Sequence, residues 1–474
     1  MSDNSKRTKK LLSETVMFAI GSFGSRILSM LLVPFYTSIL TTAEYGTIDF
    51  ILTIITLIIP LFTLSIQDAV FLFAMEKGID SKKVFSNSIL ILLFSFFVSL
   101  VSFPLVRILF ASIAEYHYLF LALFISTAGV YVTTYYLKGT DRTRIFAIQG
   151  VIYTFSFSVV NIYMLAFLHM GINGYLSSQI IANVICIIFM ICSGKLYKEV
   201  SIRLVDIKLL KKMLMYSAPL IPASVAWFVM SLIDKYMLLN MCSIEANGLY
   251  SVANKLPSII TVCTSFFTNA WQIAALRNKN DSDVVEYSSS VFHSIFSFGL
   301  LLCMALITAS KFLGYVMFAN DFFQAWTMVP ALAVSTLFST LSLLIGAQFT
   351  AAKRSDLHLK SNIISLVTNV ILNYILIKCI GALGAAIGTM MSYYIVFTYR
   401  QIIASKCSMM NFKIRNSIIG TMILIASAII TGFEIPLYQL VNVLLIVFIV
   451  VIFRKEYYSD CCLVIVFLKN KITK

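Results

Sequence analysis

The chain alternates between long apolar stretches and short polar segments over almost its whole length. About fourteen of the apolar stretches approach the roughly 20 residues that a helix needs to cross the hydrocarbon core of a membrane. We therefore predict an all-α polytopic membrane protein with about fourteen transmembrane helices. The predicted spans are 13–35, 48–72, 87–112, 118–137, 146–168, 172–193, 213–238, 251–276, 289–309, 325–350, 362–379, 382–403, 417–433 and 435–453.

Basic residues are distributed unevenly between the segments that separate these spans. When the segments are numbered alternately, one set holds 30 of the 36 lysine and arginine residues, including those of both tails. Cytoplasmic loops carry such an excess, so the pattern predicts cytoplasmic termini and an even number of spans. The net charge of +15 is then explained by membrane orientation and anionic headgroups, and it gives no reason to expect a nucleic-acid partner.

Two halves of the chain share a spacing that predicts an internal repeat. In each half a basic residue precedes a Gly-x-x-Gly turn by 27 residues, and the turn joins a pair of spans. The two copies are Arg144 with Gly171 and Gly174, and Arg354 with Gly381 and Gly384. A second pair of segments, AEYG at 43–46 and EANG at 245–248, each opens a predicted span in its half of the chain. Because both halves begin in the cytoplasm, they predict two six-helix bundles related by a parallel repeat, with a substrate site between them near the midplane.

The repeat also predicts the domain limits. A cytoplasmic segment connects the two bundles, and its mixed apolar and basic residues favour a helix on the inner leaflet surface. The last two spans are an extra helix pair. The predicted domains are 1–194 for the N-terminal bundle, 195–212 for the connecting segment, 213–403 for the C-terminal bundle and 404–474 for the extra pair with its tail.

The opening of each half resembles a known family. The first half reads FAIG at 18–21, PFY at 34–36 and EYG at 44–46, and the second reads YSAPLIP at 216–222, IDKY at 233–236 and GLYSVA at 248–253. In order and spacing these segments resemble the multidrug/oligosaccharidyl-lipid/polysaccharide export superfamily, and within it the Wzx-type oligosaccharide flippases. The resemblance covers the whole length of the chain.

This resemblance implies a function that needs no covalent chemistry. A Wzx-type protein moves an undecaprenyl-diphosphate-linked oligosaccharide repeat unit, such as an O-antigen unit of lipopolysaccharide, from the cytoplasmic to the periplasmic leaflet of the bacterial inner membrane. The expected protein is therefore not an enzyme and has no cofactor, although coupling to a proton or sodium gradient is compatible with the family. Its expected partners are the lipid-linked oligosaccharide and membrane lipids, with a polysaccharide polymerase and its chain-length machinery as candidates.

Charged residues inside the spans are the candidates for the substrate pathway, because they are costly there without a role. Arg26 lies about 20 Å along the first predicted span at 1.5 Å per residue, where it favours a contact to the diphosphate. The alternative is a structural ion pair, for instance with Asp49 of the next span. Lys235 and Lys255 are candidates for the same cationic pathway, since the family resemblance implies a cavity lined by basic residues.

Three further features have a structural and a functional interpretation. Asp234 stands beside Lys235, and the two side chains could simply neutralise each other. Asp68 could bind a coupling proton or sodium ion, or be an ordinary residue near the cytoplasmic end of a span. Pro219 and Pro222 remove backbone donors within span seven, which predicts a hinge, with a plain packing kink as the alternative.

Two other functions compete with the flippase. A cation-coupled multidrug exporter of the same superfamily would favour an acidic cavity, whereas the intramembrane charges here are mostly basic. A membrane polysaccharide polymerase or glycosyltransferase would need a large outer loop or an acidic metal-binding pair, and the sequence contains neither. The four histidines and nine cysteines match no metal-binding spacing.

Overall fold

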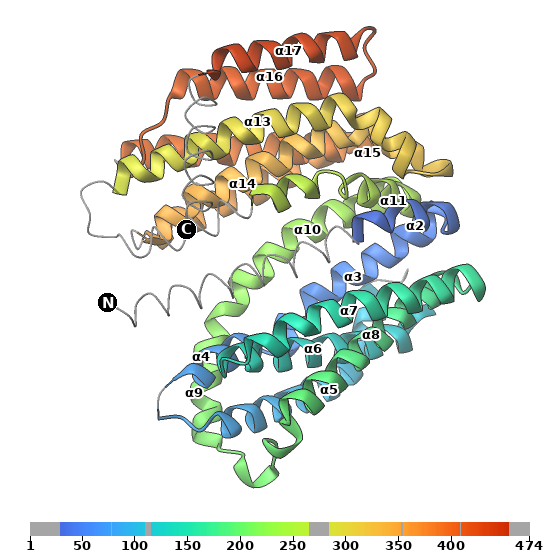
Figure 1. The fold of residues 1–474 in the computed structure, drawn as a ribbon, viewed down its shortest axis with the longest axis vertical. Helices are drawn as coiled ribbons and strands as arrows, with labels where there is room; N and C mark the ends of the chain where they lie inside the picture. Colours follow the sequence, from blue (N-terminus) through green and yellow to red (C-terminus); the bar gives the residue numbers. More distant parts are fainter. Residues whose placement is uncertain are drawn as a thin grey trace, which may run out of the picture. The chain divides into compact units, whose positions relative to one another are not determined.

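The computed structural model describes residues 29–76, 78–109, 115–264, 284–351, 354–407 and 409–454, and all regular structure within these ranges is helical. Nine of the described helices are long and apolar enough to cross a membrane. The prediction of an all-α polytopic membrane protein is therefore confirmed (Figure 1). Of the predicted spans, 13–35 lies largely outside the described residues, and 87–112 and 251–276 lie partly outside them.

Two compact units make up the chain, Met1–Lys235 and Tyr236–Lys474. The division falls inside helix α10, whereas the predicted domain limits fall at the connecting segment. The predicted six-helix bundles and their repeat stay a prediction. The helices of the first unit are α2 (Val33–Ile39), α3 (Thr42–Phe62), α4 (Ile66–Met75), α5 (Ser81–Leu109), α6 (His117–Gly139), α7 (Thr143–Ile162), α8 (Gly171–Gly194), α9 (Ile207–Ser217) and α10 (Ile221–Met241), which continues into the second.

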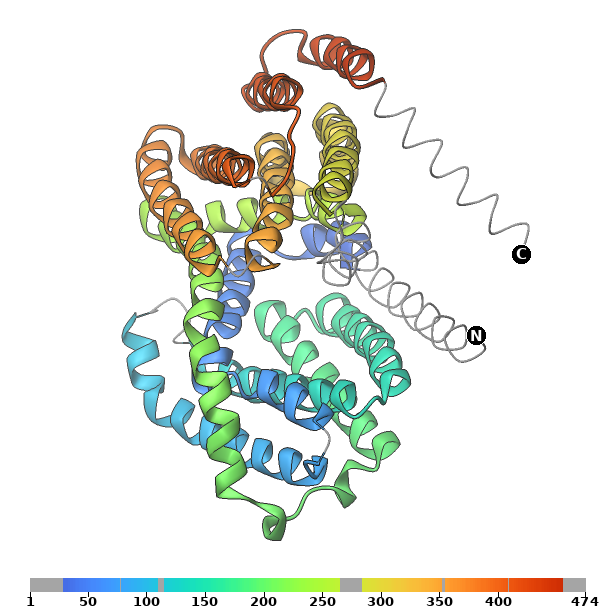
Figure 2. The same cartoon turned by 90° about the vertical axis from the view of Figure 1, so that its left-hand side faces the viewer.

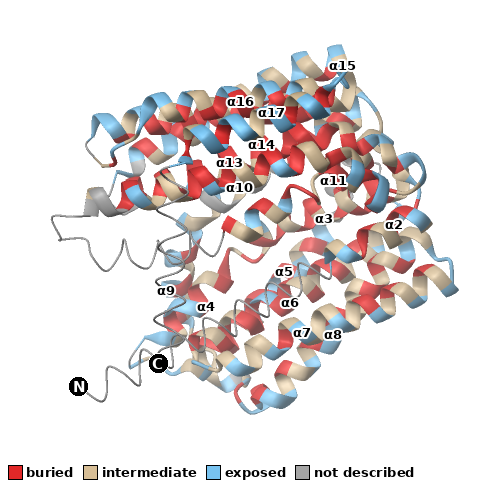
Figure 3. Ribbon diagram, turned by 45° about the horizontal axis from the view of Figure 1, so that its top comes forward, coloured by how far each residue is buried: buried red, intermediate tan, exposed pale blue. Residues whose placement is uncertain are grey.

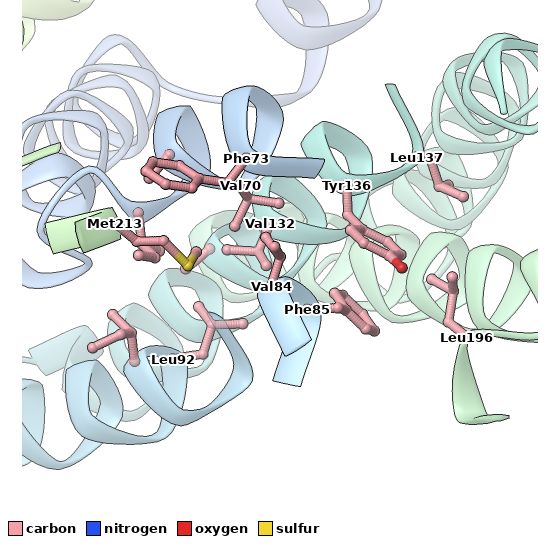
Figure 4. Packing of buried hydrophobic residues seen from close by; sticks show 14 of the residues in the cluster. Val70, Phe73, Val84, Phe85, Leu92, Val132, Tyr136, Leu137, Leu196 and Met213 are labelled. Carbon is pink, nitrogen blue, oxygen red and sulfur yellow. The ribbon is translucent and has the colours of Figure 1, made fainter. Parts of the chain in front are cut away.

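The core of the first unit lies among α4, α5, α6, α8 and α9. Phe85 of α5 stacks on Tyr136 of α6 with ring centroids 4.4 Å apart, and both side chains are almost fully buried (Figure 4). Met213 of α9 and Leu196, which follows α8, complete the same cluster. Buried apolar contacts therefore join the connecting segment to the helices that precede it.

The connecting segment packs on the helices of the first unit through one face of α9. Asp206 caps α9 by accepting hydrogen bonds from the backbone of Lys208 and Leu209, and Leu209 and Met213, one turn apart, are buried against α4 and α5. The structure shows the predicted helix, and its position on the inner leaflet surface stays a prediction, since Ile207 and Met215 of the same helix are exposed. Hydrogen bonds hold the rest of the segment, since Arg142 donates to Glu199 and to the Gly194 carbonyl.

The ion pair between Asp206 of the connecting segment and Lys83 of α5, 3.2 Å apart, makes the stability of the protein depend on pH. The hydrogen bond from the Leu209 amide, followed by that from Lys83, lowers the pKa of Asp206 below its ordinary value. The charged form therefore stabilises the folded protein at neutral pH, and this contribution is lost as the pH falls below about 3.9 through the lowered pKa. We expect Asp206→Asn to lower the Tm by about 1–3 °C at pH 7 and by less near pH 3, as measured by thermal unfolding in detergent. A deficit of equal size at both pH values would contradict this account.

The second unit contains a helical hairpin that runs as one element, α15 (Ser355–Lys406), with a sharp turn at Ile380 and Gly381. It packs on α14 (Val329–Ala351), which is largely buried (Figure 3). The last helix pair, α16 and α17, covers α13 and α14 (Figure 2). The helices of this unit are α11 (Ile244–Ala253), α13 (Val284–Met317), the 3₁₀ helix η6 (Asn320–Met328), α14, α15, α16 (Ile414–Gly432) and α17 (Tyr438–Ile452).

Arg400 joins the two arms of the α15 hairpin to each other and to α14, far from the turn at Gly381. Its guanidinium donates to Ser361 Oγ at 2.9 Å, to the Ser342 carbonyl at 2.6 Å and to Asn362 Oδ1 at 2.7 Å. The side chain is only 3% exposed, although Arg400, near the end of the predicted span 382–403, is counted among the 30 basic residues of the cytoplasmic set. It belongs to the packing of α14 and α15, because α15 continues for almost two turns beyond it.

The two Gly-x-x-Gly turns have matching roles in their units. Gly171 and Gly381 adopt positive φ angles of 52° and 60° where one helix gives way to the next, a conformation that glycine adopts without steric cost. A Cβ at Gly384 would overlap the Leu376 backbone of the preceding arm, whereas one at Gly174 would lie 2.9 Å from the Met170 Cβ and 3.2 Å from the Met164 Cβ. The first glycine of each turn has the same conformation at the same spacing, which agrees with the predicted repeat.

The openings of the matching helices also correspond. Thr41 and Glu44 form a reciprocal capping box at the start of α3, and the Ser243 hydroxyl caps α11. Thr41 and Ser243 each lie five residues before a glycine of the matched segments, Gly46 and Gly248. Hydroxyl caps of this kind define where a helix begins, so the sequence match reflects a shared helix start.

The predicted span 48–72 is wrong as a single helix. Helix α3 ends at Phe62 and α4 begins at Ile66, with Leu64 and Ser65 between them at positive φ angles of 54° and 50°. Pro60 lies two residues before the end of α3 and lacks the backbone donor that would bond to the Thr56 carbonyl. The Ser95 hydroxyl of α5 donates to the Phe62 carbonyl at 2.8 Å, which satisfies a backbone group left open by the break.

Candidate functional site

An intramembrane ion pair joins α10 to α3 in the first unit. The ammonium of Lys235 lies 2.6 Å from Asp49 Oδ2 and donates to Thr53 Oγ1 at 2.7 Å. The Lys235 and Asp49 side chains keep 18% and 19% of their surface exposed. The site is therefore a partly accessible cation with two oxygen ligands from one helix.

Local helix geometry brings the two oxygen ligands together. Asp49 and Thr53 are four residues apart on α3, which places them on the same helix face. The Thr53 hydroxyl donates to the Asp49 carbonyl at 2.8 Å, so its lone pairs are available to the Lys235 ammonium. The capping box at Thr41 defines the start of α3. It therefore determines how far along the helix Asp49 and Thr53 lie.

The ion pair lies at a similar depth on both helices. Asp49 is seven residues from the start of α3 and Lys235 is six from the end of α10, or roughly 10 Å and 9 Å at 1.5 Å per residue. Charges this far inside a span are expensive and usually pair or face water. Each partner therefore lowers the cost of burying the other.

This pairing changes two of the sequence-based interpretations. Asp49 was considered a partner for Arg26, and the structure shows it bound to Lys235; Arg26 itself lies outside the described residues. Asp234 was considered the residue that neutralises Lys235, yet the carboxylate that contacts the ammonium belongs to Asp49. Asp234 is 7% exposed and its functional role stays a prediction.

Lys255 occupies a different environment in the second unit. It follows the end of α11 in a turn, where its amide donates to the Val252 carbonyl and its own carbonyl accepts from Ser258. The side chain is half-buried, and it makes no ion pair with any residue that the structure describes. Lys255 thus presents a charge that the described carboxylates do not neutralise.

Asp68 and the two prolines lie at irregular points of their helices. Asp68 is half-buried in the first turn of α4, just after the break at Leu64 and Ser65, where the helix dipole favours a negative charge. Pro219 lies in a 3₁₀ turn between α9 and α10, and Pro222 lies in the first turn of α10. Coupling at Asp68 and a hinge at the prolines stay predictions.

Sequence reasoning did not identify Thr53 as part of the site. Its position four residues after Asp49 was an available signal, because residues at this spacing share a helix face. The pairing of Lys235 with Asp49 had no local signal, since 186 positions separate the two residues in the sequence. Only the contacts that Lys235 of α10 makes with α3 reveal it.

Comparison with known proteins assigns the chain to a family. The model of the family described as "Polysaccharide biosynthesis protein" matches residues 11–272, which is more than half of the 474-residue chain. The chain belongs to this family. The matched region includes the segments within 18–46 and 216–253 that carry the family resemblance. It also includes the connecting segment and the whole Asp49–Thr53–Lys235 site.

A curated relative agrees with this family over a shorter stretch. The "Probable low-salt glycan biosynthesis flippase Agl15" of Haloferax volcanii is 29% identical over 144 residues, which is 28% of this chain and 30% of that relative. The match thus spans less than a third of either protein.

Solved structures share the fold of this polysaccharide biosynthesis protein. The lipid II flippase MurJ in an inward closed conformation has a TM-score of 0.69 at 15% identity, covering 94% of this chain and 100% of that one. An inward-facing multidrug resistance MATE transporter of the MOP superfamily has a TM-score of 0.65 at 15% identity, covering 80% and 95%. The chain therefore has a fold found in both flippases and drug transporters.

Proposed function

We propose that this protein is a flippase for a lipid-diphosphate-linked oligosaccharide. In this proposal it carries an undecaprenyl-diphosphate-linked repeat unit of O-antigen or a similar surface polysaccharide across the bacterial inner membrane, from the cytoplasmic to the periplasmic leaflet. Both termini are cytoplasmic, and transport proceeds by alternating access. Polysaccharide polymerase and chain-length proteins are the proposed partners on the periplasmic side of the membrane.

The cationic character of the intramembrane sites, within a polysaccharide biosynthesis protein, carries this proposal. A diphosphate and a polar glycan lose their hydration when they enter hydrocarbon, and that loss is costly unless polar groups replace the water. Lys235, Lys255 and Arg26 supply positive charge within or near the predicted spans. The prenyl tail can remain in lipid, so the protein has to accommodate only the polar part of the cargo.

A cation-coupled multidrug exporter is the second candidate, and its support is the shared fold of the MATE transporters. A cationic drug would be repelled by the same lysines that favour a diphosphate. Asp49 gives little help to such a substrate, because its carboxylate contacts the Lys235 ammonium. The two functions therefore predict opposite charge preferences for the cargo.

Translocation of a lipid-linked oligosaccharide in proteoliposomes tests the proposal. We expect the wild-type chain to move the substrate between leaflets and Arg26→Ala to slow this by at least about tenfold, because an arginine can bind phosphate oxygens in a bidentate manner. Arg26→Lys should retain part of the activity, and Lys378→Ala, at an exposed lysine bound to the Tyr374 hydroxyl, should retain all of it. Full activity of Arg26→Ala would make Arg26 structural, and an inactive wild type beside a working control flippase would favour the exporter.

A further inference from the structure

The cation at the centre of the described site is already bound to an anion of the protein itself. Lys235 contacts the Asp49 carboxylate at 2.6 Å and the Thr53 hydroxyl at 2.7 Å. Both charged side chains are nevertheless about one-fifth exposed. An anionic ligand approaching Lys235 has to compete with Asp49 for the same ammonium.

We propose that Asp49 is a built-in competitor of the substrate's diphosphate, which replaces it at Lys235 during transport. This inference rests on the proposed function and adds the specificity of the site to it. In the absence of cargo, Asp49 holds the Lys235 ammonium in position at a depth where an isolated charge would be costly. When a diphosphate arrives, the Asp49 carboxylate turns away and a phosphate oxygen takes its place.

The exchange favours a diphosphate over less highly charged groups. A carboxylate carries one negative charge shared by two oxygens, whereas a diphosphate carries more charge on more acceptor oxygens. A ligand with a single carboxylate would offer the Lys235 ammonium the same contact that Asp49 already makes. Its binding would therefore bring no net gain in free energy at this ammonium. The Thr53 hydroxyl, which now donates to the Asp49 carbonyl, can rotate and donate to the arriving phosphate.

The same competition assists release. After the cargo has crossed, Asp49 can return to Lys235 and offset the loss of the phosphate contact. Without Asp49 the diphosphate would stay on Lys235 longer, since the uncharged Thr53 hydroxyl would be the remaining contact of the ammonium on α3. Asp49 therefore lowers the affinity for cargo and raises the rate at which cargo leaves.

Binding of farnesyl diphosphate to the detergent-solubilised full chain tests this exchange. We expect Asp49→Asn to bind the probe about three- to tenfold more tightly than wild type, the effect of removing a competing ion pair of modest strength. Lys235→Ala should bind it more weakly, and the Asp49→Asn/Lys235→Ala double variant should still bind it more weakly than wild type, because the ammonium is absent. Thr53→Val should weaken binding while leaving the Asp49–Lys235 pair in place.

A matched control separates the proposed role from a general effect of removing a carboxylate. Asp206→Asn also releases a lysine, Lys83, whose ammonium lies 3.2 Å from the Asp206 carboxylate, but this pair lies at the connecting segment. We expect its affinity for farnesyl diphosphate to equal that of wild type. A damaged fold would not tighten binding, so a higher affinity of Asp49→Asn cannot come from misfolding.

Transport supplies the second measurement. Asp49→Asn should show a lower KM and a lower kcat for the lipid-linked oligosaccharide, because tight binding slows release. Equal or weaker binding of the probe by Asp49→Asn, with wild-type binding intact, would overturn the exchange and leave the proposed function standing. Absence of probe binding by wild type would instead overturn the diphosphate specificity on which both proposals depend.

Discussion

Gly384→Ala is expected to prevent assembly of the second unit. A Cβ at this position would overlap the backbone carbonyl group of Leu376 in the first arm of the α15 hairpin. A backbone group cannot move aside as a flexible side chain can, so the two arms would have to separate. We expect a loss of more than about 3 kcal/mol of stability, seen as a large fall in the yield of monodisperse protein and in its Tm.

Gly150→Ala is the matched control for this substitution. Gly150 also lies inside a helix, α7, and a Cβ there would meet no atom within 4 Å. Alanine is the better helix former, so this variant should be neutral or slightly more stable. Normal folding of Gly384→Ala would mean that the two arms of α15 lie further apart than the structure shows.

Lys235→Ala is expected to cause the largest loss of transport among the described residues. The substitution removes the cation that we propose binds the diphosphate, and it leaves the Asp49 carboxylate without the ammonium it now contacts. The rate of translocation of the lipid-linked oligosaccharide should fall by at least about tenfold. This corresponds to an increase of about 1.4 kcal/mol in the activation free energy of the rate-limiting step. Lys235→Arg should retain part of the activity because it preserves the charge.

The Asp49→Asn/Lys235→Ala double variant distinguishes a transport defect from a structural one. It removes both charges of the pair together, so no unpaired charge stays buried. If it folds as well as wild type but remains inactive, the loss at Lys235 is a loss of the substrate contact. Recovery of transport in the double variant would contradict a role for Lys235 in cargo binding.

The architecture could be predicted from the sequence because membrane helices leave strong local signals. Apolar stretches identified the helices, and the Gly-x-x-Gly spacing identified two turns whose first glycines, Gly171 and Gly381, have positive φ angles. The break after Pro60 was missed, since a proline inside an apolar stretch is compatible with either a kink or an end.

The site was predictable only in part. Lys235 and Asp49 were identified because charged residues inside apolar stretches are rare and costly. Their pairing depends on how α10 packs against α3, and no sequence period encodes that contact. Arg400 illustrates the same limit, because a charge pattern that counts it with the cytoplasmic set does not reveal its buried hydrogen bonds to α14 and to the first arm of α15.

The charge preference of the cargo tests the central claim most directly. Wild-type proteoliposomes can be given a lipid-diphosphate-linked oligosaccharide, the same oligosaccharide on an uncharged lipid anchor, and a cationic dye. The account predicts rapid translocation of the first and little movement of the other two above protein-free vesicles. Transport of the dye without the diphosphate-linked cargo would contradict it and identify the protein as an exporter of cations.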